Sequence, residues 1–208
     1  MMRFDEVIGS EQELRALVGP PMPRALKKEI ARLDEHCRAL IGASPFVLIA
    51  SCDAQGRMDV SPKGDPAGFV HALDDATLAI PDRPGNRRAD TFTNVLQNPH
   101  VGLLFLIPGK LETLRVNGHA RIVRDRALRE RMAVGGKAPE LALVVTVEQA
   151  FIHCGKCMLR SQLWQAAAWP TQDGLPSQAE CLIVHARLSE SLDEVQASIE
   201  QSRRTQLY

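Results

Sequence analysis

Short apolar runs separated by turn residues fill the middle of the chain. Runs of this kind predict strands, and they lie at 45–52, 58–61, 69–73, 77–81, 101–107, 113–123 and 141–152. Tight turns rich in Gly, Pro and Asp, such as 53–56 and 108–110, join neighbouring runs. Since strands and helices do not alternate, the pattern predicts a mostly antiparallel barrel rather than a parallel sheet.

Apolar residues at helical spacing predict helices on both sides of this region. Ser10 begins a capping box before a short helix that Gly19 ends, and an amphipathic helix is expected over 26–41. A central helix is expected over 88–98, and further helices in the tail are expected over 156–166, 177–187 and 191–204. The fold class is therefore α+β, mainly β, with N- and C-terminal helical additions.

The 208 residues fit a single domain. We divide it into a helical N-terminal extension (1–42), a barrel core (43–153) and a helical C-terminal segment (154–208). Basic and acidic residues number 25 each, so the net charge predicts no general affinity for nucleic acid or an anionic membrane. The sequence begins with acidic residues instead of an apolar leader, and no apolar run is long enough to span a membrane. We expect a soluble, cytoplasmic protein.

The stretch 81–91 (PDRPGNRRADT) departs from local structural preferences. A strand ends, a Pro/Gly turn follows, and a helix is expected to begin near Asn86 or Arg87. Arg83, Arg87 and Arg88 would crowd the helix N-terminus, where each exposed cation costs about 0.3–1 kcal/mol and an anion gains a similar amount. Backbone N–H groups and guanidinium groups together suit a phosphate. The alternative is a solvated turn whose arginines pair with neighbouring acids.

The second departure is 61–66 (SPKGDP), which follows directly on strand residues. Proline and glycine within a strand mark an edge, a bulge or the close approach of a ligand. A planar ring could lie against this backbone, with Ser61 and Lys63 as hydrogen-bonding groups, although an ordinary bulged edge strand would look the same. The two stretches together suggest a ligand with a flat head and a phosphate tail.

These stretches carry a family resemblance. SPKGD at 61–65 and IPDRPGNRRADTFTNVLQNPHVGLLFLIPG at 80–109 resemble the FMN-binding core of the pyridoxamine 5′-phosphate oxidase-like flavoproteins, and FIHCGKCMLRSQLW at 151–164 resembles the C-terminal segment of one bacterial branch. The resemblance covers roughly residues 40–170. It implies an antiparallel split β-barrel of the FMN-binding type, a homodimer with FMN at the subunit interface, and hydride transfer between the flavin and a small-molecule substrate.

The resemblance also implies which residues form the site. The FMN phosphate would be held by Arg83, Asn86, Arg87 and Arg88, with Thr91 nearby. The isoalloxazine ring would lie along Ser61, Lys63 and Gly64. Backbone contacts to the ring or ribityl chain would come from Ile80, Pro81 and Asp82. The partner subunit would close the site with Lys156, Ser161 and Trp164.

The chain departs from true pyridoxamine 5′-phosphate oxidases after Trp164. Those enzymes grip the substrate with a later Arg-x-His pair, which this sequence lacks. We therefore do not expect that oxidase activity. The alternatives to an oxidoreductase are a protein that stores or senses FMN, a relative that uses deazaflavin or haem, and an anion site unrelated to flavin.

The pair Cys154 and Cys157 follows His153. A zinc site needs four ligands, and no second such pair exists, so no metal site is expected here. A thioredoxin-type redox dithiol is expected at a strand-to-helix junction of a βαβ unit, and the predicted elements contain no such unit. Structural or incidental cysteines are the expected reading, with the redox role as the alternative.

Overall fold

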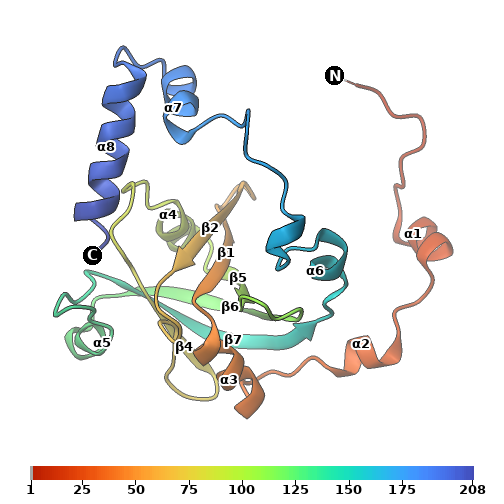
Figure 1. Cartoon of the computed structure of the whole chain (residues 1–208). Coiled ribbons are helices and arrows are strands. Elements are labelled where there is room, and N and C mark those ends of the chain that lie inside the picture. The colour runs from red at the N-terminus through yellow and green to blue at the C-terminus, as the bar shows by residue number, and fades with distance from the viewer. Residues whose placement is uncertain (1) are drawn as a thin grey trace.

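The computed structural model describes residues 2–208 and contains one antiparallel sheet of seven strands (Figure 1). The strands are β1 (Phe46–Cys52), β2 (Met58–Gly64), β3 (His71–Ala72), β4 (Thr77–Pro81), β5 (His100–Leu106), β6 (Thr113–Val123) and β7 (Ala142–His153). Their order is β2-β1-β5-β6-β7-β4-β3, and every pairing is antiparallel. The sheet curls without closing, so β2 and β3 remain edge strands. The α+β split-barrel fold class is confirmed.

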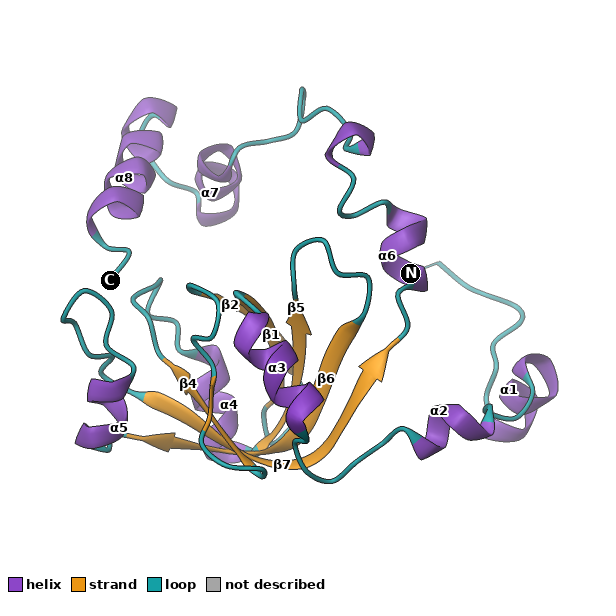
Figure 2. Cartoon of the chain, turned by 60° about the horizontal axis from the view of Figure 1, so that its bottom comes forward, coloured by secondary structure: helices purple, strands orange, loops and turns teal. Residues whose placement is uncertain are grey.

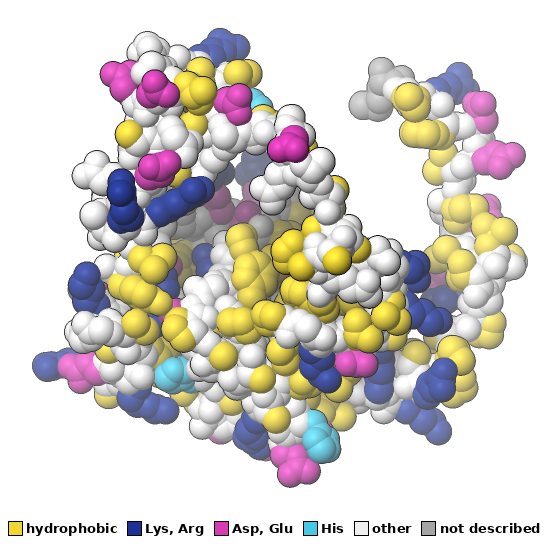
Figure 3. Space-filling view, in the orientation of Figure 1, with side chains coloured by type: hydrophobic (Ala, Val, Ile, Leu, Met, Phe, Trp, Pro, Cys, Tyr) yellow, Lys and Arg dark blue, Asp and Glu magenta, His cyan; other side chains and the backbone are white. Residues whose placement is uncertain are grey.

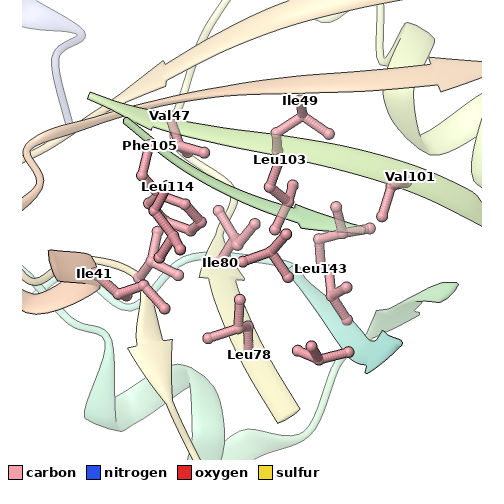
Figure 4. Packing of buried hydrophobic residues seen from close by; sticks show 14 of the residues in the cluster. Ile41, Val47, Ile49, Leu78, Ile80, Val101, Leu103, Phe105, Leu114 and Leu143 are labelled. Atoms are coloured by element: carbon pink, nitrogen blue, oxygen red, sulfur yellow. The ribbon is translucent and has the colours of Figure 1, made fainter. Parts of the chain in front are cut away.

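The hydrophobic core lies on the inner face of the curled sheet. Alternate residues of β1 and β5, among them Val47, Ile49, Leu103 and Phe105, are almost completely buried, and Figure 4 shows them converging with side chains from β4, β6 and β7. Successive side chains of a strand point to opposite faces of the sheet, so the alternate residues of each strand lie together on the inner face. Each fully buried aliphatic side chain contributes about 1.5–3 kcal/mol of transfer free energy.

Three helices pack close to the barrel. Helix α3 (Glu35–Ala43), capped by Asp34, contacts β3 and β6 and buries Ile41. Helix α4 (Asp90–Gln97) packs against β1, β2 and β6. Helix α5 (Arg126–Arg131) follows β6. Cys37 and Ile41 of α3 and Val95 of α4 all belong to the core that the curled sheet surrounds.

Both ends of the chain extend away from the barrel (Figures 1 and 2). Helices α1 (Glu11–Val18) and α2 (Pro23–Lys27) bury no residue, and Figure 3 shows hydrophobic side chains exposed along this arm. After β7 come α6 (Lys156–Ser161), a 3₁₀ turn (Ala166–Ala168), α7 (Gln178–Ala186) and α8 (Leu192–Thr205). Helices α7 and α8 pack on each other. No helix within residues 2–208 combines the length and apolarity that a membrane crossing requires.

The helix predicted over 26–41 is wrong in its middle. The chain leaves α2 after Lys27, and Ile30 exchanges both backbone hydrogen bonds with Ala150 of β7, at 3.0 and 2.7 Å. Asp34 then caps a new helix by accepting a hydrogen bond from the backbone N–H of Cys37. Pairing with a distant strand overrides the local helical spacing.

Three other boundaries differ from the sequence prediction. Strand β2, predicted to begin with residues 58–61, continues through Pro62 to Gly64, since an edge strand tolerates proline. Strand β3 is only two residues long, and α5 is additional. Helix α4 begins at Asp90, later than the expected start near Asn86 or Arg87, so the arginines lie in the loop before it.

A β-bulge interrupts the pairing of β6 with β7. Gly118 pairs with Val147, whereas Asn117 pairs with Gln149, so Glu148 is the extra residue. A Cβ atom at position 118 would overlap the carbonyl oxygen of Thr146, and only glycine fits there.

We expect Gly118→Ala to lower the free energy of unfolding by at least about 2 kcal/mol, because the overlap is with backbone and the longest strands must shift. Urea denaturation measures the loss. The control is Gly42→Ala in α3, where a Cβ meets no atom within 4 Å and a gain of about 0.5–1 kcal/mol is expected. Equal effects of the two substitutions would contradict the close approach.

Candidate functional site

Polar side chains of β2 lie on the core side of the sheet. Ser61 pairs with Ile49 and Lys63 pairs with Val47, and both partners are fully buried. Side chains that are directly opposite each other share a face. Since β2 is an edge strand, its polar inner face lines the opening of the barrel rather than the packed core.

A buried ion pair connects the ends of β2 and β4, which no backbone ladder joins. Arg83, which follows β4, donates from Nε to Oδ2 of Asp65, which follows β2, at 2.6 Å. The side chains are 16% and 1% exposed. Arg83 Nη2 also donates to the carbonyl oxygen of Met132 at 2.9 Å. The remaining Asp65 oxygen accepts a 2.6 Å hydrogen bond from the hydroxyl of Tyr208, which raises the pKa of that phenol.

Side-chain hydrogen bonds hold helix α4 against β1 and β2. Thr91 Oγ1 donates to the carboxylate of Asp59 on β2 at 3.3 Å, and Asn94 Nδ2 donates to Ser51 Oγ of β1 at 3.0 Å. Thr91, Asn94 and Ser51 are all buried. The start of α4 therefore has a fixed position beside β2.

The loop 82–89 carries backbone strain just before α4. Arg87 and Ala89 adopt left-handed conformations, with φ of 60° and 56°. For residues with a Cβ atom this costs about 1–2 kcal/mol each. Ala89 is the N-cap of α4 and offers no side-chain acceptor, whereas side chains cap α1, α3, α5, α7 and α8. The first N–H groups of α4 thus remain available to an anion.

The three arginines of this loop differ in their partners. Arg83 is held by Asp65, as described above. Arg88 donates from Nε to Asp90 at 2.6 Å, which raises the pKa of Arg88, and its backbone N–H donates to Asn86 Oδ1 at 3.0 Å. Arg87 is exposed and has no hydrogen bond or ion pair with any residue in 2–208.

Asp82 links the loop electrostatically to β2. Burial raises the pKa of its half-buried carboxyl, and the charges of Lys63 and Arg83 oppose that shift. Lys63 is therefore close enough to act on the end of β4. The two sequence stretches, 61–66 and 81–91, meet at the open edge of the barrel.

A cavity of about 180 Å³ adjoins this edge. It is lined by Asp82, Arg83, Pro84, Lys137, Ala138, Pro139, Glu140 and Tyr208. This volume is smaller than the roughly 300–1,000 Å³ that is usual for ligand pockets.

The residues expected from a partner subunit lie on and after α6. Lys156 is exposed, Ser161 Oγ donates to the carbonyl oxygen of Met158, and Trp164 Nε1 donates to that of Lys110 at 2.7 Å. None of the three hydrogen-bonds to the loop 82–89 of its own chain. Trp164 thus ties this segment to the turn between β5 and β6.

Sequence reasoning did not single out Asp59, Asp65 or Tyr208. Asp65 lies in the SPKGD stretch, so its charge beside Lys63 was an available signal. Tyr208 gives no local signal, since its contact spans 143 residues. Cys154 and Cys157 are exposed free thiols, and within residues 2–208 no three His, Cys, Asp or Glu side chains group as metal ligands do.

The family model for pyridoxamine 5′-phosphate oxidase matches residues 33–154, more than half of the chain. The chain therefore belongs to the pyridoxamine 5′-phosphate oxidase family, whose fold binds flavin. No curated protein matches it.

Several solved structures are similar to part of the chain. HupZ from Group A Streptococcus is 20% identical, with a TM-score of 0.48, over 58% of this chain and 93% of that one. A putative pyridoxamine 5′-phosphate oxidase from Lactobacillus delbrueckii is 20% identical, with a TM-score of 0.45, over 59% and 99%. An FMN-binding protein from Syntrophomonas wolfei is 14% identical, with a TM-score of 0.43, over 55% and 82%.

We expect Asp65→Asn to lower the free energy of unfolding by about 3–5 kcal/mol, because it leaves the Arg83 charge buried without its counter-ion. Urea denaturation at neutral pH measures this. Asp75→Asn is the matched control, since its pair with Arg32 is exposed and is worth less than about 1 kcal/mol. A loss at Asp65 no larger than that at Asp75 would argue against a structural role for the buried pair.

Proposed function

We propose that this protein is an FMN-dependent oxidoreductase acting on a small organic molecule. The observation that carries the proposal is the meeting of two unusual stretches, 61–66 and 81–91, at the open edge of the barrel. One stretch offers polar groups for a flat ring, and the other offers cations and free N–H groups for a phosphate. Membership of the family supports FMN as the ligand that joins the two.

The phosphate end of the proposed site is the loop 82–89. Arg87 has a free guanidinium group, and the uncapped N-terminus of α4 adds backbone donors. In the proposal Asn86 and Arg88 contribute beside them, with Thr91 nearby. Arg83 positions the loop through Asp65 and keeps Nη1 for the ligand, because its recorded hydrogen bonds use Nε and Nη2.

The ring end of the proposed site is the inner face of β2. Ser61 and Lys63 project there, and Gly64 follows them at the end of the strand. Ile80 and Pro81 end β4, and Asp82 comes directly after it. Bound FMN would supply the hydride chemistry. Lys63 would place a positive charge near the ring, which favours the reduced cofactor.

A second copy of the chain completes the site in this proposal. Phe46, Met58 and Val60 expose apolar surface on the outer face of the sheet, beside an open depression of about 310 Å³. Leu48, Ala50 and Leu104 line that depression. Covering this face in a homodimer would remove the apolar surface from water, and the partner's Lys156, Ser161 and Trp164 would close the ring end.

The first test is the visible absorption spectrum of the purified protein, followed by mass identification of the released chromophore. We expect oxidised-flavin bands, release of FMN, and reduction by a nicotinamide donor with reoxidation by an organic acceptor. Tight FMN without any turnover would indicate storage or sensing. A protein that is colourless and does not take up added FMN would refute the proposal.

Arg87→Ala should weaken FMN binding at least about tenfold, since a charge-assisted hydrogen bond to phosphate contributes about 1.5–3 kcal/mol. Fluorescence titration of the apoprotein with FMN measures the dissociation constant. Riboflavin, which lacks the phosphate, should bind the variant and the parent protein equally. Arg124→Ala, which removes an exposed arginine paired with Glu140, is the control and should leave FMN affinity unchanged. Loss of riboflavin affinity in Arg87→Ala would contradict a phosphate role.

Val60→Glu should dissociate the homodimer, because it buries a charge in the proposed apolar interface. Sedimentation equilibrium measures the association, and FMN affinity should fall in parallel. Leu96→Glu is the control, since Leu96 is exposed on α4, away from this sheet face. A dimer that withstands Val60→Glu but not Leu96→Glu would place the interface elsewhere.

A further inference from the structure

A cluster of two histidines and a glutamate lies outside the candidate flavin site. His100 of β5 and His119 of β6 are directly paired across the ladder, and their Nε2 atoms are 2.9 Å apart. His119 Nδ1 lies 2.8 Å from Oε1 of Glu148 on β7. Three neighbouring strands therefore contribute to one polar cluster on the barrel surface.

The hydrogen bonds around the cluster define where the ring protons lie. Asn98 Oδ1 accepts from the backbone N–H of His100 at 3.2 Å, and its Nδ2 donates to Sγ of Cys52 at 3.0 Å, which fixes the orientation of the amide. The same oxygen lies 2.7 Å from His100 Nδ1, which must therefore carry a proton. Glu148 likewise accepts from His119 Nδ1. The two Nε2 atoms therefore face each other, and one donates to the other only when one of the rings carries both ring protons.

A divalent metal ion can replace that shared proton, since both Nε2 atoms then act as its ligands. The ring centroids are 4.3 Å apart and the rings are tilted by 58°, so the two nitrogens do not lie on the line that joins the rings. Metal–nitrogen bonds of about 2.0–2.1 Å place adjacent ligand nitrogens about 2.9 Å apart at an angle of about 90° and about 3.3 Å apart at a tetrahedral angle, so the rings need only a small adjustment to bind one ion.

The position of Glu148 relative to His119 follows from the β-bulge between β6 and β7. Glu148 is the extra residue of the β6–β7 bulge, and bulges redirect side chains. The bulge requires Gly118, next to His119. A carboxylate that holds the second ring nitrogen of a histidine is the usual outer partner of a metal ligand. The side chains of His119 and Glu148 are 40% and 49% exposed, so an ion and its waters can enter.

We propose that His100 and His119 bind one divalent late transition-metal ion, such as Zn²⁺, Cu²⁺ or Ni²⁺, through their Nε2 atoms. Imidazole nitrogen is a preferred ligand of these ions. Asn98 and Glu148 orient the two rings from the outer side. No third protein ligand converges there among residues 2–208, so water fills the remaining positions and the site is open.

The test is a titration of tag-free protein with Cu²⁺ and Zn²⁺ in a Cys154→Ser/Cys157→Ser background, which removes the exposed thiols as competing ligands. We expect one ion per chain, and nitrogen couplings from two imidazoles in the Cu²⁺ electron paramagnetic resonance spectrum. His100→Gln and His119→Gln should each lower the affinity more than tenfold, and Glu148→Gln should lower it about tenfold. His185→Gln on α7 is the control and should change nothing.

Binding that survives both His100→Gln and His119→Gln would overturn the proposal, as would the absence of saturable binding by Zn²⁺, Cu²⁺ and Ni²⁺. Circular dichroism verifies that each variant is folded. The site does not rest on flavin, so a metal-free result with normal FMN content would refute this proposal alone.

Discussion

The buried ion pair between Arg83 and Asp65 joins the two ends of a sheet that does not close. No backbone ladder connects β2 with β3 and β4, so side chains must hold the edges in register. The pair is favourable only because both charges are well satisfied, Asp65 by Arg83 and the hydroxyl of Tyr208, and Arg83 by Asp65 and a backbone carbonyl. Its position fixes where the chain leaves β4 and therefore where the loop 82–89 begins.

From that anchor the chain must reach a helix that is itself fixed. Thr91 is tied to β2 through Asp59, and Asn94 is tied to β1. Seven residues separate Arg83 from Thr91, and two of them, Arg87 and Ala89, adopt left-handed backbone conformations. Strain of this kind persists only where the surroundings enforce it, and it is commonly found at functional sites. The same geometry leaves the helix start without a side-chain cap.

The local sequence pattern predicts most of the strands. It does not predict features that depend on a residue far away in the sequence. Strands 77–81 and 113–123 agree with the sequence prediction because each is an apolar or alternating run bounded by turn residues, which is a local signal. The prediction of one helix over 26–41 is wrong in its middle, because Ile30 pairs with Ala150, 120 positions away. Along the sequence the arginines of 81–91 look equivalent. The structure separates them, because the partner of Arg83 is 18 residues distant and no local rule reveals it.

Helix α4 lies between the candidate flavin site and the histidine pair. Its N-terminus faces the strained loop, and Asn98 at its C-terminus holds His100 and Cys52. A ligand at one end of α4 could alter the geometry at the other end only if the helix moved as a rigid body. The buried hydrogen bond from Asn94 to Ser51 and the contacts with β1, β2 and β6 oppose such movement. Packed interiors of this kind do not deform continuously, so coupling between the two ends of α4 would require a second packing arrangement of the whole helix.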